Sequence, residues 1–325
     1  MTAARAFWTT AAGQGEIRSA SAPDPKPGEA RLRTLVSAIS PGTERLIFRG
    51  GAPESLWSAM RCPHQDGDFP FPVKYGYACV GVVEDGPSDW VGARAFCLHP
   101  HQTRFTVPLA ALRRLPDALP TPRAALAANM ETAVNALWDA GPRLGDRIAV
   151  VGCGVVGLLV AGLAVRIPGC AVQAIDPDPA RRARAARLGA DAVEPDAAAP
   201  DADLVIHASA TEAGLACALR LARLEGTVLE LSWYGDQAPR APLGEAFHPR
   251  RLKLISSQVG RLAPAQAVRW TDASRAAFAL SLLADPDFDA IWDDAGRFDD
   301  LPAIMAAVAA GGGAPAPIIR YEEKG

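Results

Sequence analysis

The chain has 325 residues, of which 49% are hydrophobic and 21% are charged, and its formal net charge at pH 7 is −3. That length is sufficient for two domains, each with its own hydrophobic core. The small negative charge argues against nucleic acid or an anionic membrane surface as the main partner. The sequence therefore predicts a soluble globular protein with no nucleic acid partner and no membrane partner.

The cysteines and the N-terminal residues indicate the cellular compartment in which the protein is expected. The six cysteines occur singly, and no pair has C-x-x-C spacing, so neither a zinc loop nor a disulfide scaffold is indicated. The N-terminal stretch MTAARAFWTT has no apolar segment of the kind found in signal peptides. The uncharged stretch Ile148–Val165 is long enough to suggest a membrane helix, but glycines interrupt it. We expect a cytoplasmic protein.

Residues 1 to about 120 carry the pattern of short β-strands. Arg31–Ser37 alternates polar and apolar residues, and further strands are predicted at 78–84, 93–98 and 104–107. Clusters of proline and glycine separate these segments, which is typical of a small barrel-like domain. Residues 44–68 have less strand signal and are predicted to form a short helix and a loop.

From Pro122 onward, helical and strand patterns alternate. Ala124–Ala140 is an alanine-rich helix that Gly141-Pro142 ends. Strands are then predicted at 148–151, 171–175, 192–193, 204–207, 227–231 and 252–256, with helices up to 166 and at 179–188 and 213–224. Six strands with intervening helices indicate a doubly wound parallel sheet. Helices at 273–283 and 301–310 and a last strand at 317–321 follow.

The stretch Arg147–Gly157, RIAVVGCGVVG, predicts a strand, a tight turn and the start of a helix. Gly152, Gly154 and Gly157 have the G-x-G-x-x-G spacing of a dinucleotide-binding turn. In that motif the glycines permit the tight turn, the approach of backbone to a pyrophosphate, and close packing of the helix. The N–H groups and the positive dipole end of the helix then face the phosphates. An ordinary glycine-rich turn is the alternative.

An acidic residue follows the turn at the expected distance. Asp176 ends the next predicted strand, 19 residues past Gly157, where a carboxylate binds ribose hydroxyls. A carboxylate there repels the 2′-phosphate of NADP, so we expect tighter binding of NAD unless Arg181 or Arg182 binds that phosphate. The predicted cofactor-binding residues are Gly152, Gly154, Val155, Val156, Gly157, Asp176, Ser209 and Ser232.

The order of these parts resembles the medium-chain dehydrogenase/reductase superfamily, which includes the zinc-type alcohol dehydrogenases. The resemblance rests on Tyr75-Gly76-Tyr77, Gly81-Val82-Val83, the glycine turn, Ala186–Asp191 and Ser257–Gly260. It implies an α/β protein with a GroES-like β-barrel catalytic domain (1–132 and 261–325). A Rossmann doubly wound parallel-sheet domain (133–260) is implied to bind NAD(P).

Within the superfamily, Ser40–Glu44 and Gly76-Tyr77 look most similar to the branch that contains bacteriochlorophyllide (2-desacetyl-2-hydroxyethyl) dehydrogenases. Those enzymes oxidise a hydroxyethyl alcohol on a tetrapyrrole. The resemblance therefore implies an alcohol or carbonyl substrate that is a small molecule rather than a macromolecule, and that is large and planar for its class.

The chain departs from the zinc enzymes of this superfamily at their metal ligands. Those enzymes use Cys in a G-I-C-x-T/S-D segment, His in G-H-E, and a third Cys, Asp or Glu. Here the first segment has Ser40, the second has Tyr77, and only Glu131 stands where the third ligand is expected. Because catalytic zinc needs about three protein ligands, we expect no zinc and no other metal. A site completed by His64, His99 or His101 is the alternative.

Without zinc, another group must polarise the substrate oxygen. The resemblance implies that Thr43 is a proton-relay hydroxyl and that Tyr77 replaces a ligand that faces the substrate. A phenol can donate a hydrogen bond to a carbonyl, or take a proton from an alcohol if its pKa is lowered. Glu131 is expected to orient one of them or to act as the base. A helix cap at Thr43, simple packing of Tyr77 and a surface position for Glu131 stay open.

We predict a zinc-independent, NAD(P)-dependent oxidoreductase of the alcohol dehydrogenase-like type, which transfers a hydride between nicotinamide and an alcohol/carbonyl pair. The alternatives are an enone or quinone reductase of the same superfamily, and a nucleotide-binding protein without catalysis. Members of the superfamily commonly pair through the last Rossmann strand, here Leu252–Ser256. An uncovered strand edge favours such pairing, so we expect a homodimer.

Overall fold

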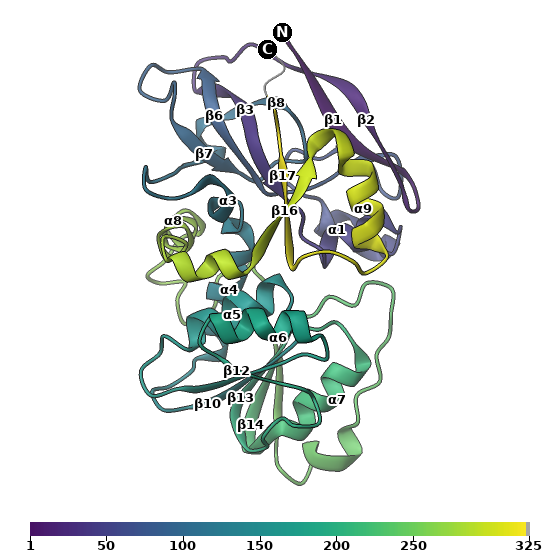
Figure 1. The fold of residues 1–325 in the computed structure, drawn as a ribbon, viewed down its shortest axis with the longest axis vertical. Helices are drawn as coiled ribbons and strands as arrows, with labels where there is room; N and C mark the ends of the chain where they lie inside the picture. The colour runs from purple at the N-terminus through teal and green to yellow at the C-terminus, as the bar shows by residue number, and fades with distance from the viewer. Residues whose placement is uncertain (323–325) are drawn as a thin grey trace. The chain divides into compact units, whose positions relative to one another are not determined.

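The computed structural model describes residues 1–322, and its chain divides into two compact units (Figure 1). Unit 1 comprises Met1–Ala128, Leu280–Ala284 and the chain from Trp292 onward, and unit 2 comprises Asn129–Ala279 and Asp285–Ile291. The domain limits after residues 132 and 260 come from the resemblance, and they stay a prediction.

The smaller sheet of unit 1 has four strands in the order β2-β1-β5-β4. These are β1 (Thr2–Ala11), β2 (Gln14–Ala22), β4 (Asp66–Gly67) and β5 (Val73–Lys74). β1 and β2 form an antiparallel hairpin whose turn includes Gly13 at φ +71°. The sequence pattern did not single out this hairpin, because its many Ala, Thr and Ser residues give little contrast between buried and exposed positions.

The larger sheet of unit 1 has the order β16-β17-β3-β6-β7-β9, and β8 also pairs with β3. Its strands are β3 (Glu29–Ala38), β6 (Cys79–Asp85), β7 (Arg94–Cys97), β8 (Arg104–Pro108), β9 (Leu112–Arg114), β16 (Trp292–Arg297) and β17 (Ala316–Arg320). Four of the predicted strands, and the predicted last strand, are confirmed as β3, β6, β7, β8 and β17. β16 was not predicted, because its sequence WDDAGR lacks an apolar run.

The helices of unit 1 are short. They are α1 (Thr43–Phe48), η1 (Glu54–Leu56), α2 (Trp57–Met60), η2 (Leu109–Ala111), α3 (Thr121–Ala124), η5 (Phe298–Asp300) and α9 (Leu301–Ala309). The predicted helix and loop at 44–68 is confirmed by α1 and α2. Apolar side chains from β3, β6, β7 and β8, including Leu32, Val83 and Phe105, form one buried cluster.

Unit 2 contains a parallel sheet in the order β12-β11-β10-β13-β14-β15. Its strands are β10 (Arg147–Val151), β11 (Ala171–Ile175), β12 (Asp191–Val193), β13 (Ala202–His207), β14 (Ala222–Glu230) and β15 (Lys253–Ser256). The order reverses between β10 and β13, which is the doubly wound arrangement. In such sheets ligands bind outside the carboxyl ends of the strands at the point of reversal.

The helices of unit 2 are α4 (Ala127–Ala140), α5 (Val155–Ala164), α6 (Pro179–Arg187), α7 (Glu212–Leu221), most of α8 (Asp272–Leu282), η3 (Leu243–Phe247) and η4 (Pro286–Ala290). Figure 1 shows α5 and α6 on one side of the strands and α7 on the other. The predicted helix 213–224 was too long, because Ala222 already pairs with Ala202 of β13. Within residues 1–322, no helix is long and apolar enough to cross a membrane.

Candidate functional site

The glycine turn between β10 and α5 can be built only with glycine at two of its three positions. Gly152 has φ +102°, and a Cβ there would lie 2.7 Å from the backbone of Ser209. A Cβ on Gly157 would lie 1.8 Å from the carbonyl oxygen of Gly152. At Gly154 a Cβ would meet no heavy atom within 4 Å, so this stretch of backbone faces open space. The turn therefore has the close packing and the accessible backbone that a pyrophosphate needs.

The first turn of α5 supplies hydrogen-bond donors beside that open backbone. Gly154 is the N-cap of the helix, and Val155 and Val156 are its first two residues. The first N–H groups of an α-helix have no partner within the helix, so they are available to a phosphate. This placement fits the cofactor role predicted for both valines.

Asp176 lies directly against the glycine turn. Its side chain is buried, and it accepts hydrogen bonds from the backbone N–H groups of Cys153, at 2.8 Å, and Asp178, at 2.9 Å. Each carboxylate oxygen keeps a further lone pair for a ribose hydroxyl. The structure thus brings Asp176 and the fingerprint together, as a ribose-binding carboxylate requires.

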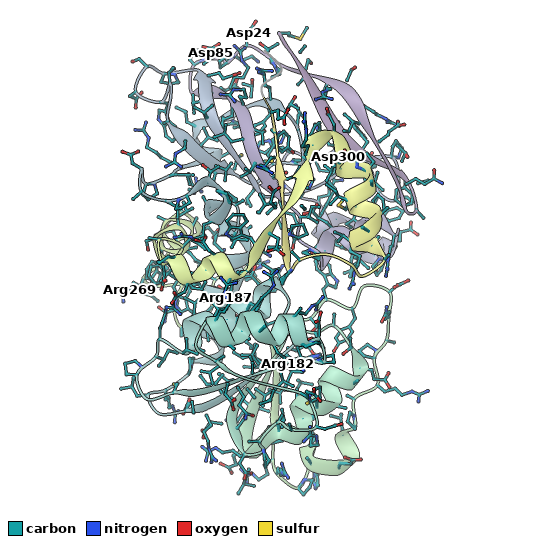
Figure 2. The ribbon with its side chains drawn as sticks, in the orientation of Figure 1. Asp24, Asp85, Arg182, Arg187, Arg269 and Asp300 are labelled. Carbon is teal, nitrogen blue, oxygen red and sulfur yellow. The ribbon has the colours of Figure 1, made fainter. Side chains whose placement is uncertain are left out.

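The two arginines predicted as possible phosphate ligands already have partners. Arg182, labelled in Figure 2, donates to the carbonyls of Asp176 and Pro177, each at 2.8 Å, and to Glu194. Nη1 of Arg181 lies 3.9 Å from Asp176, and its Nε lies 3.6 Å from Asp178. Arg182 is therefore committed to the turn, whereas Arg181 makes only long ion pairs.

A polar cluster occupies the carboxyl ends of β13 and β14. His207 is fully buried, with Nε2 2.7 Å from Ser209 Oγ and Nδ1 2.8 Å from Glu230 Oε2. Ser232 accepts a hydrogen bond from the N–H of Ala210, and Tyr234 donates to Glu230. Burial acts to raise the pKa of Glu230, but the hydrogen bonds and charge of His207, together with hydrogen bonds from Ser232, hold that pKa below its usual value.

This cluster fixes the orientation of the two serines that were predicted to bind cofactor. Ser209 also packs against Gly152, so it lies beside the glycine turn. The serine–histidine–carboxylate geometry resembles a hydrolytic triad. However, the N–H of Ala210, which would stabilise an oxyanion after Ser209, is already donated to Ser232. The fit of unit 2 to a dinucleotide therefore rests on the glycine turn and Asp176.

The candidate catalytic side chains of unit 1 lie at the start of α1 and before β6. Tyr77 is half-buried, and the side chains of Ser40 and Thr43 are hydrogen-bonded to its hydroxyl. Burial, reinforced by the carboxylate of Glu44, raises the pKa of Tyr77 to about 12. The structure thus brings together Thr43 and Tyr77 and adds Ser40. At neutral pH this phenol is protonated and can act as a proton donor.

Next to this group lies a buried contact between a carboxylate and an imidazole that the sequence did not predict. The Glu44 carboxylate accepts the N–H of Ser40 at 2.8 Å and lies 2.8 Å from Nε2 of His101. Glu44 is 3% and His101 is 1% exposed. The burial of His101 argues against direct contact with a substrate. His99 is also buried, and its ring stacks on Phe105.

Glu131, the third candidate catalytic residue, lies in unit 2 on α4. It is 9% exposed, and Nε of the buried Arg275 donates to its carboxylate at 3.1 Å. Arg275 also donates to Asn135, which accepts the N–H of Ala263. This network holds the 257–275 segment against α4. The surface alternative for Glu131 is wrong, since the residue is buried, and its catalytic role stays a prediction.

The side chains that could act as metal ligands are poorly suited to zinc. Within residues 1–322, no group of three or more His, Cys, Asp or Glu side chains is arranged to hold a metal ion. Burial raises the pKa of both Cys62 and Cys97 to about 12. Ser40 and Tyr77 offer hydroxyl oxygens, which zinc sites in proteins do not favour.

Comparison with known proteins shows what this chain is similar to. No protein-family model matches the sequence. D-guloside 3-dehydrogenase of Escherichia coli (strain K12) is 25% identical over 260 residues, which cover 71% of this chain and 74% of that protein.

Solved structures match along the whole chain. 2R,3R-butanediol dehydrogenase from Bacillus subtilis superposes with a TM-score of 0.77 at 18% identity, covering 98% of this chain and 99% of that one. A short chain alcohol dehydrogenase (rspB) from E. coli CFT073, complexed with NADH, gives a TM-score of 0.75 at 16% identity, covering 98% and 100%. The chain thus has the fold of these dehydrogenases, with a GroES-like sheet domain and a Rossmann domain, and the predicted fold class is confirmed.

Proposed function

We propose that the protein is a nicotinamide-dependent oxidoreductase that interconverts an alcohol and a carbonyl without zinc, with Tyr77 as its proton donor. The observation that carries this proposal is the hydroxyl group of Tyr77, which is hydrogen-bonded to Ser40 and Thr43. The resemblance places zinc ligands at Ser40 and Tyr77. The glycine turn and Asp176 support the cofactor. The similarity to dehydrogenases of butanediol and of a guloside supports the reaction class.

The direction that this geometry favours is reduction. The cofactor supplies a hydride to the carbonyl carbon when it is bound. Tyr77 gives its proton to the carbonyl oxygen, and the resulting phenolate regains a proton from solvent. Because the pKa of Tyr77 is raised to about 12, the proton is present at neutral pH. In the reverse direction the phenolate would take the proton of the alcohol, and the raised pKa lowers the fraction of phenolate at neutral pH.

The proposal is tested by product analysis. Purified protein with NADH or NADPH would be assayed on ketones, on enones and on quinones, including a large planar aromatic ketone. Formation of a secondary alcohol supports the proposal, whereas reduction of C=C in an enone supports the alternative reductase. Tight cofactor binding without turnover on the whole panel would indicate a nucleotide-binding protein without catalysis.

Metal removal should leave the activity unchanged. We expect purified protein to contain far less than one zinc ion per chain, because hydroxyl oxygens replace the ligands that zinc favours. Elemental analysis after dialysis against a chelator, together with assays before and after, measures this. Zinc that remains stoichiometric through that dialysis would contradict the proposal.

We further propose a homodimer formed through the edge of the parallel sheet. β15 is the end strand, and all four of its residues are exposed, including Leu254 at 39% and Ile255 at 36%. An exposed apolar edge favours pairing with a second copy. Light scattering at micromolar concentration should give the mass of a dimer, and Ile255→Asp should give a monomer. Leu224→Asp, an equally apolar exposed position outside β15, should remain dimeric. A monomeric wild type refutes this proposal.

A further inference from the structure

Unit 1 contains a hydrogen-bonded chain of four buried side chains that the proposed reaction does not use. Tyr321 OH lies 3.0 Å from Ser37 Oγ, which lies 2.7 Å from Nδ1 of His101. Nε2 of His101 lies 2.8 Å from Glu44. Each of the four residues is 9% exposed or less. A buried carboxylate needs such a partner, since an unpaired charge in an apolar interior is costly.

The hydroxyls in this chain allow His101 to carry either one proton or two. When both ring nitrogens are protonated, Nε2–H donates to Glu44, Nδ1–H donates to Ser37, and Ser37 donates to Tyr321. When Nδ1 is unprotonated, Ser37 donates to it and Tyr321 donates to Ser37. Rotation of two hydroxyls therefore keeps every polar atom paired in both states. The hydrogen-bond geometry therefore accommodates a doubly protonated His101 beside Glu44.

The carboxylate of Glu44 acts electrostatically on the pKa values of the groups around it. Its carboxylate contributes to the raised pKa of five groups, which are Cys62, Tyr75, Tyr77, Cys79 and Tyr321. Burial is the main cause in each case, and all five are neutral at pH 7. His101 is thus the group in contact with Glu44 that can offset its charge.

Two contacts connect this ion pair to Tyr77. Glu44 holds the N–H of Ser40, whose side chain is hydrogen-bonded to the Tyr77 hydroxyl. Gly76, which precedes Tyr77, packs on the imidazole, since a Cβ there would lie 3.0 Å from Cδ2 of His101. We infer that Glu44 and His101 form a buried charge pair that positions Tyr77 and sets how readily it gives up its proton. This inference rests on the proposed function, in which Tyr77 is the proton donor.

The test is the titration of Tyr77 in the free protein, followed by tyrosinate absorbance. The chain has only four tyrosines, and subtracting the spectrum of the matching Tyr77→Phe variant isolates Tyr77. Glu44→Gln removes the negative charge and should lower the Tyr77 midpoint by about one pH unit, a tenfold change in the dissociation constant. His101→Gln removes the imidazole in contact with Glu44 and should raise that midpoint. The double variant should behave as Glu44→Gln does.

Opposite shifts separate a charge effect from general damage, which would move both single variants in one direction. His99→Gln is the matched control, because His99 is equally buried but has no contact with Glu44 among the described residues. It should leave the titration unchanged. Circular dichroism at each pH identifies the range in which each variant is folded, and the Tyr77 midpoint is taken only from that range. Glu44→Gln is expected to move the Tyr77 midpoint toward neutral pH. If the histidine variants unfold, the midpoint of Glu44→Gln compared with that of the wild type is sufficient to test the inference.

The inference is overturned if Glu44→Gln leaves the Tyr77 midpoint unchanged or raises it, or if both single variants shift it in the same direction. The titration needs neither substrate nor cofactor. An inactive protein with the expected shifts would therefore count against the proposed function only. An active reductase whose Tyr77 titration ignores Glu44 would count against this inference only.

Discussion

Tyr77→Phe should lower kcat for carbonyl reduction by about 10²- to 10⁴-fold, the usual loss when a positioned general acid is removed. The substitution removes one hydroxyl and keeps the ring, which packs edge-on against Tyr75 with ring centroids 6.1 Å apart. Because that hydroxyl acts mainly in the transition state, KM for the carbonyl should change far less than kcat. Steady-state kinetics with saturating reduced cofactor measures both constants.

Tyr75→Phe provides the matched control. The Tyr75 hydroxyl is buried and donates to the carbonyl of Met60 at 3.0 Å. Its loss should cost stability of about 1 kcal/mol while leaving kcat within about threefold of wild type. If Tyr77→Phe keeps more than about a tenth of wild-type kcat, Tyr77 is not the proton donor. In that case Thr43, or Glu131 despite its ion pair with Arg275, becomes the candidate to examine.

The sequence predicted unit 2 almost element by element, because its signals are local. The alternation of buried apolar runs with helices and the spacing of Gly152, Gly154 and Gly157 each lie within short windows of the chain. The β1–β2 hairpin was missed for the same reason: residues such as Ala3, Thr9 and Ser19 carry little hydrophobic contrast. Local pattern thus predicts a Rossmann unit better than an irregular barrel.

The candidate site was predictable only where a motif marks it. Thr43 and Tyr77 followed from a resemblance, but the partner of Glu44 lies 57 residues away at His101. The partner of Glu131 is 144 residues away, at Arg275. Nothing in a single sequence pairs such residues, since only the fold brings them into contact. A charged residue within an apolar stretch, as at Glu131, signals a buried partner without saying which residue it is.

The other large effect concerns the choice of cofactor. Wild-type protein should bind NAD about 5- to 150-fold more tightly than NADP, the ratio that corresponds to about 1–3 kcal/mol of repulsion between Asp176 and a 2′-phosphate. Asp176 is buried against the N–H of Cys153, so its charge is poorly screened by solvent. Isothermal titration of both cofactors, each in oxidised form, measures the ratio directly.

Asp176→Asn and Asp176→Ser should narrow or reverse that preference. The asparagine keeps one oxygen, which can accept the N–H of Cys153, but its NH2 group then faces the N–H of Asp178, whereas serine shortens the side chain as well. Either change removes the 3.9 Å partner of Arg181, which keeps its 3.6 Å contact with Asp178. The expected result is weaker NAD binding and stronger NADP binding, and the asparagine variant changes the shape of the side chain less than serine does.

Asp178→Ser is the control for this change. Asp178 is an exposed N-cap of α6 whose carboxylate accepts the N–H of Ala180, so solvent screens its charge. It should alter the ratio of cofactor affinities by less than about threefold. Equal binding of NAD and NADP by the wild type, or an equal response to both substitutions, would mean that the arginines of α6 govern this site. The preference would then be set by Arg181 and its neighbours rather than by the carboxylate beside the glycine turn.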